Sequence, residues 1–270
     1  MKKTMRVAAI MVVSALLQTA PVKAASIRLC NSTEFWPPYS FLKDGKLVGE
    51  HTAILDAAFS DLKLRYIQLA LPWKRCQDRV AAGELAGIIG ISYTEERNRL
   101  YHFPADAREK APLDALSQLE FVIVTHANTP APESISIEAL PEPVGALLGY
   151  RLANTVRSAG KHAQVVAQQS SLFQMLERSR IASAVVLRGT AQYYVSQSNE
   201  QLVIHEPALW STPHFLAFGR TSDIKASQMA KIWAAVEAVR SDDARMAVIR
   251  RKVNETLAPC FATDSACRHN

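Results

Sequence analysis

The stretch that decides the fold runs Ile88-Ile89-Gly90-Ile91-Ser92-Tyr93-Thr94-Glu95-Glu96-Arg97. Its apolar part, residues 87–91, has the length and the β-branched content of a buried strand. The turn after it carries the hydroxyls of Ser92 and Thr94, and Arg97 comes three residues past Thr94. We expect these donors to gather beyond the end of the strand and to bind a carboxylate, because an arginine fork holds both oxygens. The alternative is a helix capped by Thr94, with an acidic first turn and a surface arginine.

Residues 1–25 have the features of a secretion signal. Basic residues precede an apolar run at residues 7–17, and cleavage is expected after Ala24 or Ala25, which are small. The run is too short to span a bilayer, and no other long uncharged apolar run follows it. We therefore expect a periplasmic protein.

The mature chain is close to neutral. Four of the charges behind the formal net charge of +6 belong to the secretion signal, which has no acidic residue, so the mature net charge is +2. The other charges are scattered, without a run of lysines and arginines. No nucleic-acid partner is therefore expected.

Four cysteines in an exported chain favour disulfides over metal binding, and the spacing of cysteines and histidines is not that of a zinc site. Three pairings are possible. We expect Cys260 to pair with Cys267, which closes a small C-terminal loop. Cys30 is then expected to pair with Cys76, which ties the end of the first strand to the start of the second helix. No metal and no cofactor is expected.

Strand and helix patterns alternate along the mature chain. The spacing of apolar residues predicts strands at residues 26–31, 64–69, 87–91, 119–125, 143–148, 163–167, 182–187 and 214–219. It predicts helices at residues 51–62, 72–82, 152–159, 171–179, 190–196, 227–240 and 243–256.

This βαβ rhythm occurs twice, which predicts an α/β protein of two lobes, each a mostly parallel sheet flanked by helices. We expect residues 26–120 and 214–270 to form lobe 1 and residues 121–213 to form lobe 2. Strands near Leu119 and His214 are then two hinge crossings. Ligands of open α/β sheets bind beyond the carboxyl ends of the strands, so the site is expected between the lobes.

A series of motifs runs through nearly the whole mature chain and is most specific in its first half. The motifs are Trp36-Pro37-Pro38-Tyr39, Asp44-Gly45-Lys46-Leu47-Val48-Gly49, Leu69-Ala70-Leu71-Pro72-Trp73-Lys74-Arg75, Ala82-Gly83-Glu84-Leu85, Ile91-Ser92-Tyr93-Thr94-Glu95-Glu96-Arg97, Tyr101-His102-Phe103-Pro104, Val144-Gly145-Ala146-Leu147-Leu148-Gly149 and Leu176-Glu177-Arg178-Ser179-Arg180-Ile181. With these motifs the chain resembles the bacterial extracytoplasmic solute-binding proteins of family 3, the polar-amino-acid binding group of ABC importers. The resemblance implies the type II periplasmic-binding-protein fold.

The resemblance also implies roles for individual residues. Trp36 matches the aromatic residue that stacks on the ligand, Ser92 the ligand-binding hydroxyl, and Arg97 the arginine that grips the α-carboxylate. The segment Gly149-Tyr150-Arg151 matches a second-lobe loop at a helix N-terminus, where backbone donors also reach the carboxylate. Tyr39 is a further candidate, although it and Trp36 are alternatively core aromatics held by the neighbouring prolines.

The sequence departs from the family in two places. The family usually has an aspartate after its Gly-Glu-Leu motif, where this chain has Ala86. It also usually has an aspartate that receives the ligand's ammonium at the end of a strand, where this chain has Leu187-Arg188. Glu34 is a candidate replacement for that aspartate. Without it, a cleft bearing several arginines favours an anion that has no amine.

We therefore expect a periplasmic solute-binding protein that captures a small polar solute, an amino acid or a related carboxylate, between two closing lobes. Its expected partners are this ligand and an ABC permease in the inner membrane, and it is expected to be a monomer without catalytic residues. One alternative is an enzyme like the periplasmic cyclohexadienyl dehydratases, which also resemble this family, with Glu34 as the candidate general acid. Another is a ligand-sensing subunit of a membrane receptor.

Overall fold

The computed structural model describes residues 26–199 and 201–262 of the 270-residue chain. The expected secretion signal and Cys267 lie outside the described residues, so the predicted Cys260–Cys267 pair does too. Within the described ranges, no helix is both long enough and apolar enough to cross a membrane.

Strands and helices alternate through most of the chain. The strands are β1 (Ile27–Ser32), β2 (Phe41–Lys43), β3 (Lys46–Val48), β4 (Tyr66–Leu71), β5 (Gly87–Ser92), β6 (Tyr101–His102), β7 (Ser117–His126), β8 (Val144–Leu147), β9 (Ala163–Val166), β10 (Ser183–Leu187) and β11 (Leu202–Gly219). The helices are α1 (Glu50–Asp61), α2 (Trp73–Ala81), α3 (Glu95–Asn98), α4 (Arg151–Ser158), α5 (Gln169–Glu177), α6 (Arg188–Gln197), α7 (Ala226–Ser241) and α8 (Asp243–Ala262).

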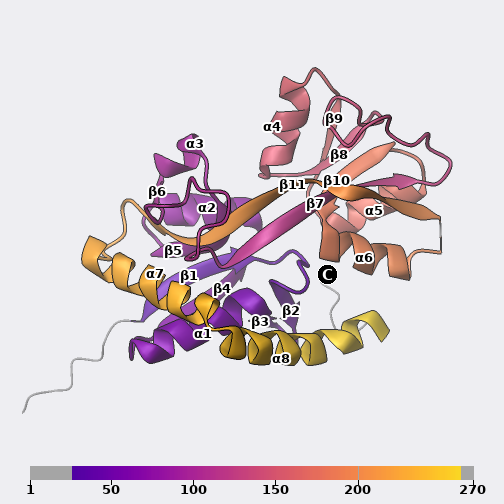
Figure 1. Ribbon diagram of the computed structural model, residues 1–270. Helices are drawn as coiled ribbons and strands as arrows, with labels where there is room; N and C mark the ends of the chain where they lie inside the picture. The colour runs from indigo at the N-terminus through magenta and orange to yellow at the C-terminus, as the bar shows by residue number, and fades with distance from the viewer. Residues whose placement is uncertain (1–25, 200, 263–270) are drawn as a thin grey trace, which may run out of the picture.

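A curled, mixed sheet connects the two lobes in the strand order β4-β1-β5-β11-β7-β10-β8-β9. Lobe 1 is built on the parallel strands β4, β1 and β5, and lobe 2 on the parallel strands β10, β8 and β9. The long strands β7 and β11 are antiparallel and run side by side from one lobe into the other (Figure 1). The two-lobed α/β fold with two crossings is therefore confirmed. The expected lobe boundaries, at residues 120/121 and 213/214, fall within these two strands and stay predictions.

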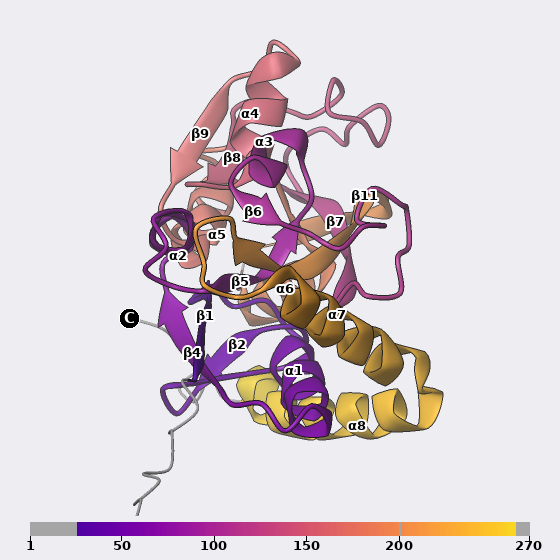
Figure 2. The ribbon, with the colours of Figure 1, turned by 90° about the vertical axis from the view of Figure 1, so that its left-hand side faces the viewer.

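Helices cover both faces of each lobe's sheet because successive strand residues point to opposite sides. In lobe 1, Leu29 and Ile89 pack against α1 and α7, whereas their neighbours Cys30 and Ile88 pack against α2. Figure 2 shows α1, α7 and α8 together on one side of this lobe. In lobe 2, Val122 of β7 packs against α5, and the next residue, Ile123, packs against α4.

The largest departure from the predicted elements is β11, which begins at Leu202 rather than near residue 214. Its first half contains Pro207 and Glu206 and is mostly exposed or half-buried, features that argue against a strand. The pairing with β7 shifts register between His205 and Trp210, and this irregularity accommodates the proline. The sequence of this segment alone therefore does not predict a strand, and its pairing with β7 stabilises it as one.

Helices α5 and α8 also differ from the predicted ranges. Helix α5 begins at Gln169 and not at residue 171, so Ser170 and Ser171 lie inside its first turn and do not cap it. Helix α8 continues to Ala262 and contains Pro259.

Candidate functional site

A cleft lies between the lobes beside the crossing strands. The side chains that line it come from the loop before β2, α2, β5 and α3 on one side and from β7, α4 and β11 on the other. They are Trp36, Trp73, Ser92, Arg97, Phe121, Tyr150, Arg151, Leu152, Trp210, Thr212 and His214. The cleft has a volume of about 50 Å³, which is room for roughly four water molecules. The lobes are therefore close together, and a larger solute requires them to separate.

Arg97 follows β5 on α3, and its side chain lines the cleft. Its Nη1 donates to the backbone oxygen of Ser92 at 3.0 Å and to Ser92 Oγ at 2.7 Å. Within the described part of the chain, Nε and Nη2 have no hydrogen-bond partner, which leaves them available to a ligand. Burial lowers the pKa of Arg97 to about 10, and the charge of Arg151 acts in the same direction. The guanidinium thus keeps its charge at pH 7 and is fixed in place for an anion.

Thr94 caps the same short helix. Its Oγ1 accepts a hydrogen bond from the backbone N–H of Arg97 at 3.1 Å, and its side chain does not line the cleft. The segment is therefore an acidic, N-capped helical turn whose arginine still faces the cleft. The Thr94 cap and the acidic turn of the alternative are therefore present, but its surface arginine is not, because Arg97 lines the cleft.

Arg151 approaches the cleft from lobe 2, as the first residue of α4. Its side chain is exposed, and its Cζ lies 5.9 Å from the ring centroid of Trp210 in a cation–π contact. Gly149 does not line the cleft. It has a φ of 81°, and its carbonyl accepts a hydrogen bond from Gln77 Nε2 of lobe 1 at 3.3 Å.

Aromatic rings form one wall of the cleft. The rings of Trp73 and Tyr150 stack with centroids 5.7 Å apart, and Trp36 lies 5.6 Å from Tyr150 and 6.3 Å from Trp73. Tyr39 stands outside the lining, with its ring 5.7 Å from His51. Trp36 and Tyr150 are thus placed to contact a ligand, and Tyr39 supports Trp36 from behind.

The loop between β1 and β2 also contacts lobe 2 outside the cleft. Thr190 Oγ1 of α6 donates to the backbone oxygen of Phe35 at 3.0 Å. At Gly189 the two lobes come so close that a Cβ would lie 2.0 Å from the backbone oxygen of Pro37. Only glycine permits this approach, so the described arrangement of the lobes depends on it.

Glu34 belongs to this contact and does not line the cleft. Its Oε2 accepts a hydrogen bond from the backbone N–H of Gln169, the first residue of α5, at 3.3 Å. Burial raises the pKa of Glu34 to about 7, although that hydrogen bond acts in the opposite direction. A carboxyl group that is partly protonated at neutral pH and already bonded is a poor partner for a ligand's ammonium.

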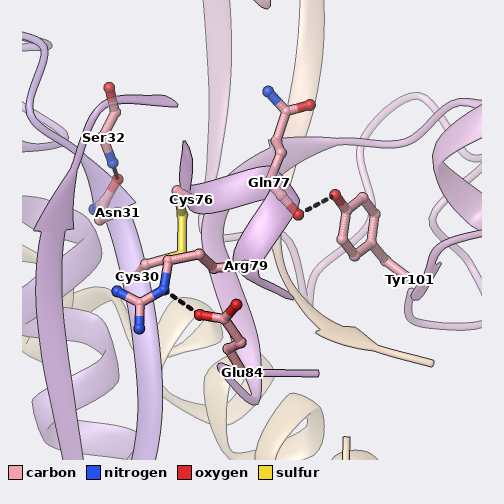
Figure 3. Close-up of a disulfide and its surroundings, with 8 residues drawn as sticks. All are labelled: Cys30, Asn31, Ser32, Cys76, Gln77, Arg79, Glu84 and Tyr101. Atoms are coloured by element: carbon pink, nitrogen blue, oxygen red, sulfur yellow. Dashed lines mark hydrogen bonds and ion pairs between the residues drawn. A yellow bond between two sulfur atoms is a disulfide. The ribbon is translucent and has the colours of Figure 1, made fainter. Parts of the chain in front are cut away.

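The disulfide Cys30–Cys76 is confirmed, with Cα atoms 5.8 Å apart. It joins β1 to α2 in lobe 1 (Figure 3). Helix α2 carries Trp73, and β1 ends at Ser32, whose Oγ lies 3.3 Å from the hydroxyl of Tyr150 in lobe 2. The disulfide therefore fixes two elements that contact lobe 2 or the ligand space.

Several residues that line the cleft were not predicted from the sequence. Trp210, Thr212 and His214 alternate along β11 and so share one face of it, which is the signal that could have identified them. Phe121, Leu152 and Trp73 also line the cleft and were not among the predicted site residues.

His214 is a neutral member of the lining. Burial lowers its pKa to about 3, and the charges of His51, Arg97 and Arg151 act in the same direction. Its Nδ1 lies 3.1 Å from the backbone oxygen of Thr212. This ring nitrogen therefore carries the proton and donates it, so that Nε2 is an acceptor.

Arg188 does not contribute to the cleft. Its guanidinium forms ion pairs with Glu120 and Glu206, and it is absent from the lining. The preceding residue, Leu187, is buried against Trp36 and Leu119. The strand end at this position is therefore apolar.

Solved structures of other proteins identify the fold of this chain. No family model matches the chain, and no curated protein matches it. Solved structures match over most of its length. The arginine-, lysine-, histidine-binding protein ArtJ from Geobacillus stearothermophilus is 19% identical, with a TM-score of 0.66 over 88% of this chain and 96% of that one.

Two further structures have the same arrangement. An ancestral arginine-binding protein bound to arginine is 22% identical, with a TM-score of 0.67 over 86% of this chain and 97% of that one. A histidine kinase sensor domain with similarity to periplasmic binding proteins is 18% identical, with a TM-score of 0.70 over 84% of this chain and 95% of that one. The chain therefore has the two-lobed α/β fold of the periplasmic binding proteins.

Proposed function

We propose that this protein is a periplasmic solute-binding protein that captures a small carboxylate-bearing solute between its lobes and delivers it to an ABC permease. The observation that carries the proposal is the guanidinium of Arg97, which lines the cleft with Nη1 bonded to Ser92. A carboxylate bound to Nε and Nη2 would receive two parallel hydrogen bonds. Arg151, from the other lobe, would add a second positive charge when the lobes close.

Closure is the output of such a protein. A solute that contacts both lobes binds the closed form better than the open form, and this differential affinity shifts the population toward closure. A permease can then distinguish the loaded from the empty protein by shape. The strands β7 and β11, which cross between the lobes, are the elements that would bend.

Proteins of similar fold support this role. Three of them are the arginine-, lysine-, histidine-binding protein ArtJ, an ancestral arginine-binding protein and the substrate-binding protein of an amino acid ABC transporter. A sensor role would use the same cleft, and a histidine kinase sensor domain is among the proteins of similar fold. A pull-down from membranes, with a permease or a receptor recovered, separates these two roles.

We do not favour an enzyme. The dehydratase alternative needs a general acid facing the cleft, and its candidate, Glu34, lies outside the lining with its carboxylate bonded to Gln169. Incubation with prephenate and with arogenate is expected to yield no product. Product formation that is lost in Glu34→Gln would establish the enzyme instead.

A thermal-shift screen tests the proposed function. The purified mature protein is heated with amino acids, monocarboxylates, dicarboxylates and amines that carry no carboxylate. A ligand that binds only the folded state raises the melting temperature, because at a hundredfold excess over Kd it adds about 2.7 kcal/mol to the free energy of unfolding. We expect the positive compounds to carry a carboxylate. Stabilisation by the amines alone would contradict the proposal.

A further inference from the structure

The ionised side chains that line the cleft are all positive. In the described residues of the lining, Arg97 and Arg151 carry charge and no aspartate or glutamate is present. His214 is neutral at pH 7, and Glu34 is outside the lining and bonded to Gln169. A protonated amine bound here would lose its water beside two guanidiniums, without a carboxylate to pair with it. Such a placement is strongly unfavourable.

Several hydrogen-bond donors around the cleft lack an acceptor, whereas Nε2 of His214 is an acceptor in the lining. The indole N–H groups of Trp73 and Trp210 are buried and have no acceptor within the described residues. Arg97 contributes Nε and Nη2, and the hydroxyls of Ser92 and Tyr150 are close by. Buried donors without acceptors are costly. Oxygen acceptors on an occupant would bind Nε and Nη2 of Arg97, which an ammonium cannot do.

The aromatic wall does not form a cage for a quaternary ammonium group. A ring binds such a group with its face. The rings of Trp73 and Tyr150 stack against each other with centroids 5.7 Å apart, so each turns one face toward the other ring and not toward the ligand space. The face of Trp210 is already occupied by the Arg151 guanidinium. The rings therefore provide an apolar wall rather than a cation site.

We infer that the solute is an organic anion without a protonated amine, and that 2-oxo acids are the class that best fits this cleft. The carboxylate binds Arg97, and the oxo group offers a further acceptor to the surrounding donors. The apolar part of the solute lies against the aromatic wall. The inference rests on the proposed function, because it names the solute of the same cleft.

Skeleton-matched pairs of compounds test the inference. Kd is measured by calorimetry for pyruvate and L-alanine, 4-methyl-2-oxopentanoate and L-leucine, phenylpyruvate and L-phenylalanine, and 2-oxoglutarate and L-glutamate. Glycine betaine is the quaternary ammonium probe. For the pair that binds best, we expect the oxo acid to bind at least about tenfold tighter, because an uncompensated like charge in a binding site is strongly penalised.

Each other outcome overturns the inference in a distinguishable way. Equal or tighter binding of the amino acid shows that the amine is accepted, and leaves the proposed function intact. Preferential binding of glycine betaine shows that the rings hold a cation. If none of these compounds binds and the thermal-shift screen finds no carboxylate, the proposed function fails as well.

A charge placed in the cleft provides a second test. Thr212 lines the cleft on β11, so Thr212→Asp introduces the missing carboxylate, and Thr212→Asn is the uncharged control of nearly the same shape. We expect the preference for the oxo acid to fall about tenfold in the aspartate variant and to persist in the asparagine variant. Equal behaviour of the two variants would contradict an electrostatic origin of the preference.

Discussion

The two arginines that face the cleft come from opposite lobes and are held in different ways. Arg97 is partly buried, and its Nη1 makes two hydrogen bonds to Ser92 at the end of β5. Arg151 is exposed at the start of α4 and rests 5.9 Å from the ring centroid of Trp210. The first guanidinium keeps its position before a ligand arrives, whereas the second is free to adjust.

This difference assigns separate roles to the two lobes. A preorganised cation loses little side-chain freedom on binding, so its contacts contribute more of their strength to affinity. An exposed cation is screened by water and salt and contributes less. Lobe 1 would therefore hold the solute first, and lobe 2 would close over it.

Removal of the held guanidinium is expected to have the largest effect. Arg97→Ala should weaken binding of the best compound from the thermal-shift screen by roughly 2–5 kcal/mol, the loss found when one partner of a buried charge pair is truncated. Calorimetry measures the change in Kd. Arg99→Ala is the matched control, because Arg99 is exposed and lies two residues further along the same turn.

The control should bind within a few-fold of the wild type. If Arg97→Ala also does so, the carboxylate is held elsewhere and the contrast between the two arginines disappears. A melting temperature close to that of the wild type would show that the loss is one of binding and not of folding.

The hydrogen bonds that fix Arg97 in place can be weakened without removing its charge. Ser92→Ala removes the hydroxyl that accepts from Nη1 but keeps the backbone acceptor, so we expect a loss of roughly 0.5–1.5 kcal/mol in binding. Thr94→Ala is the comparison variant, because it removes the cap of α3 and not a cleft contact. It should lower stability by about 1 kcal/mol with a smaller change in Kd. The reverse pattern would place the ligand at Thr94.

The sequence predicted the lobe 1 wall better than the lobe 2 wall for a physical reason. The run from Ile88 to Arg97 is local: an apolar strand, a hydroxyl turn and an arginine within a few residues. Local order of this kind shows in composition and periodicity. The disulfide between Cys30 and Cys76, in the same lobe, was also predicted from the cysteine positions.

The other wall depends on pairing between distant segments. Trp210, Thr212 and His214 face the cleft only because β11 pairs with β7 across a register shift. Pro207 and Glu206 are unfavourable in a strand, so this part of the sequence does not predict one. Glu34 shows the same limit from the opposite direction, since its loop position suggested a ligand contact and its observed partner, Gln169, is 135 positions away.

The smallest expected effect belongs to the exposed arginine. Arg151→Ala should cost about 0.2–1 kcal/mol of binding, the usual range for an exposed charge pair. Because the interaction is screened, added salt should weaken binding less in this variant than in the wild type. Arg157→Ala, an exposed arginine at the other end of α4, is the control with the same change in net charge and should keep the wild-type salt dependence. Titrations at low and high salt measure the slopes. Equal slopes in the two variants would show that Arg151 does not reach the ligand, and a loss as large as that of Arg97→Ala would show that both arginines are anchors.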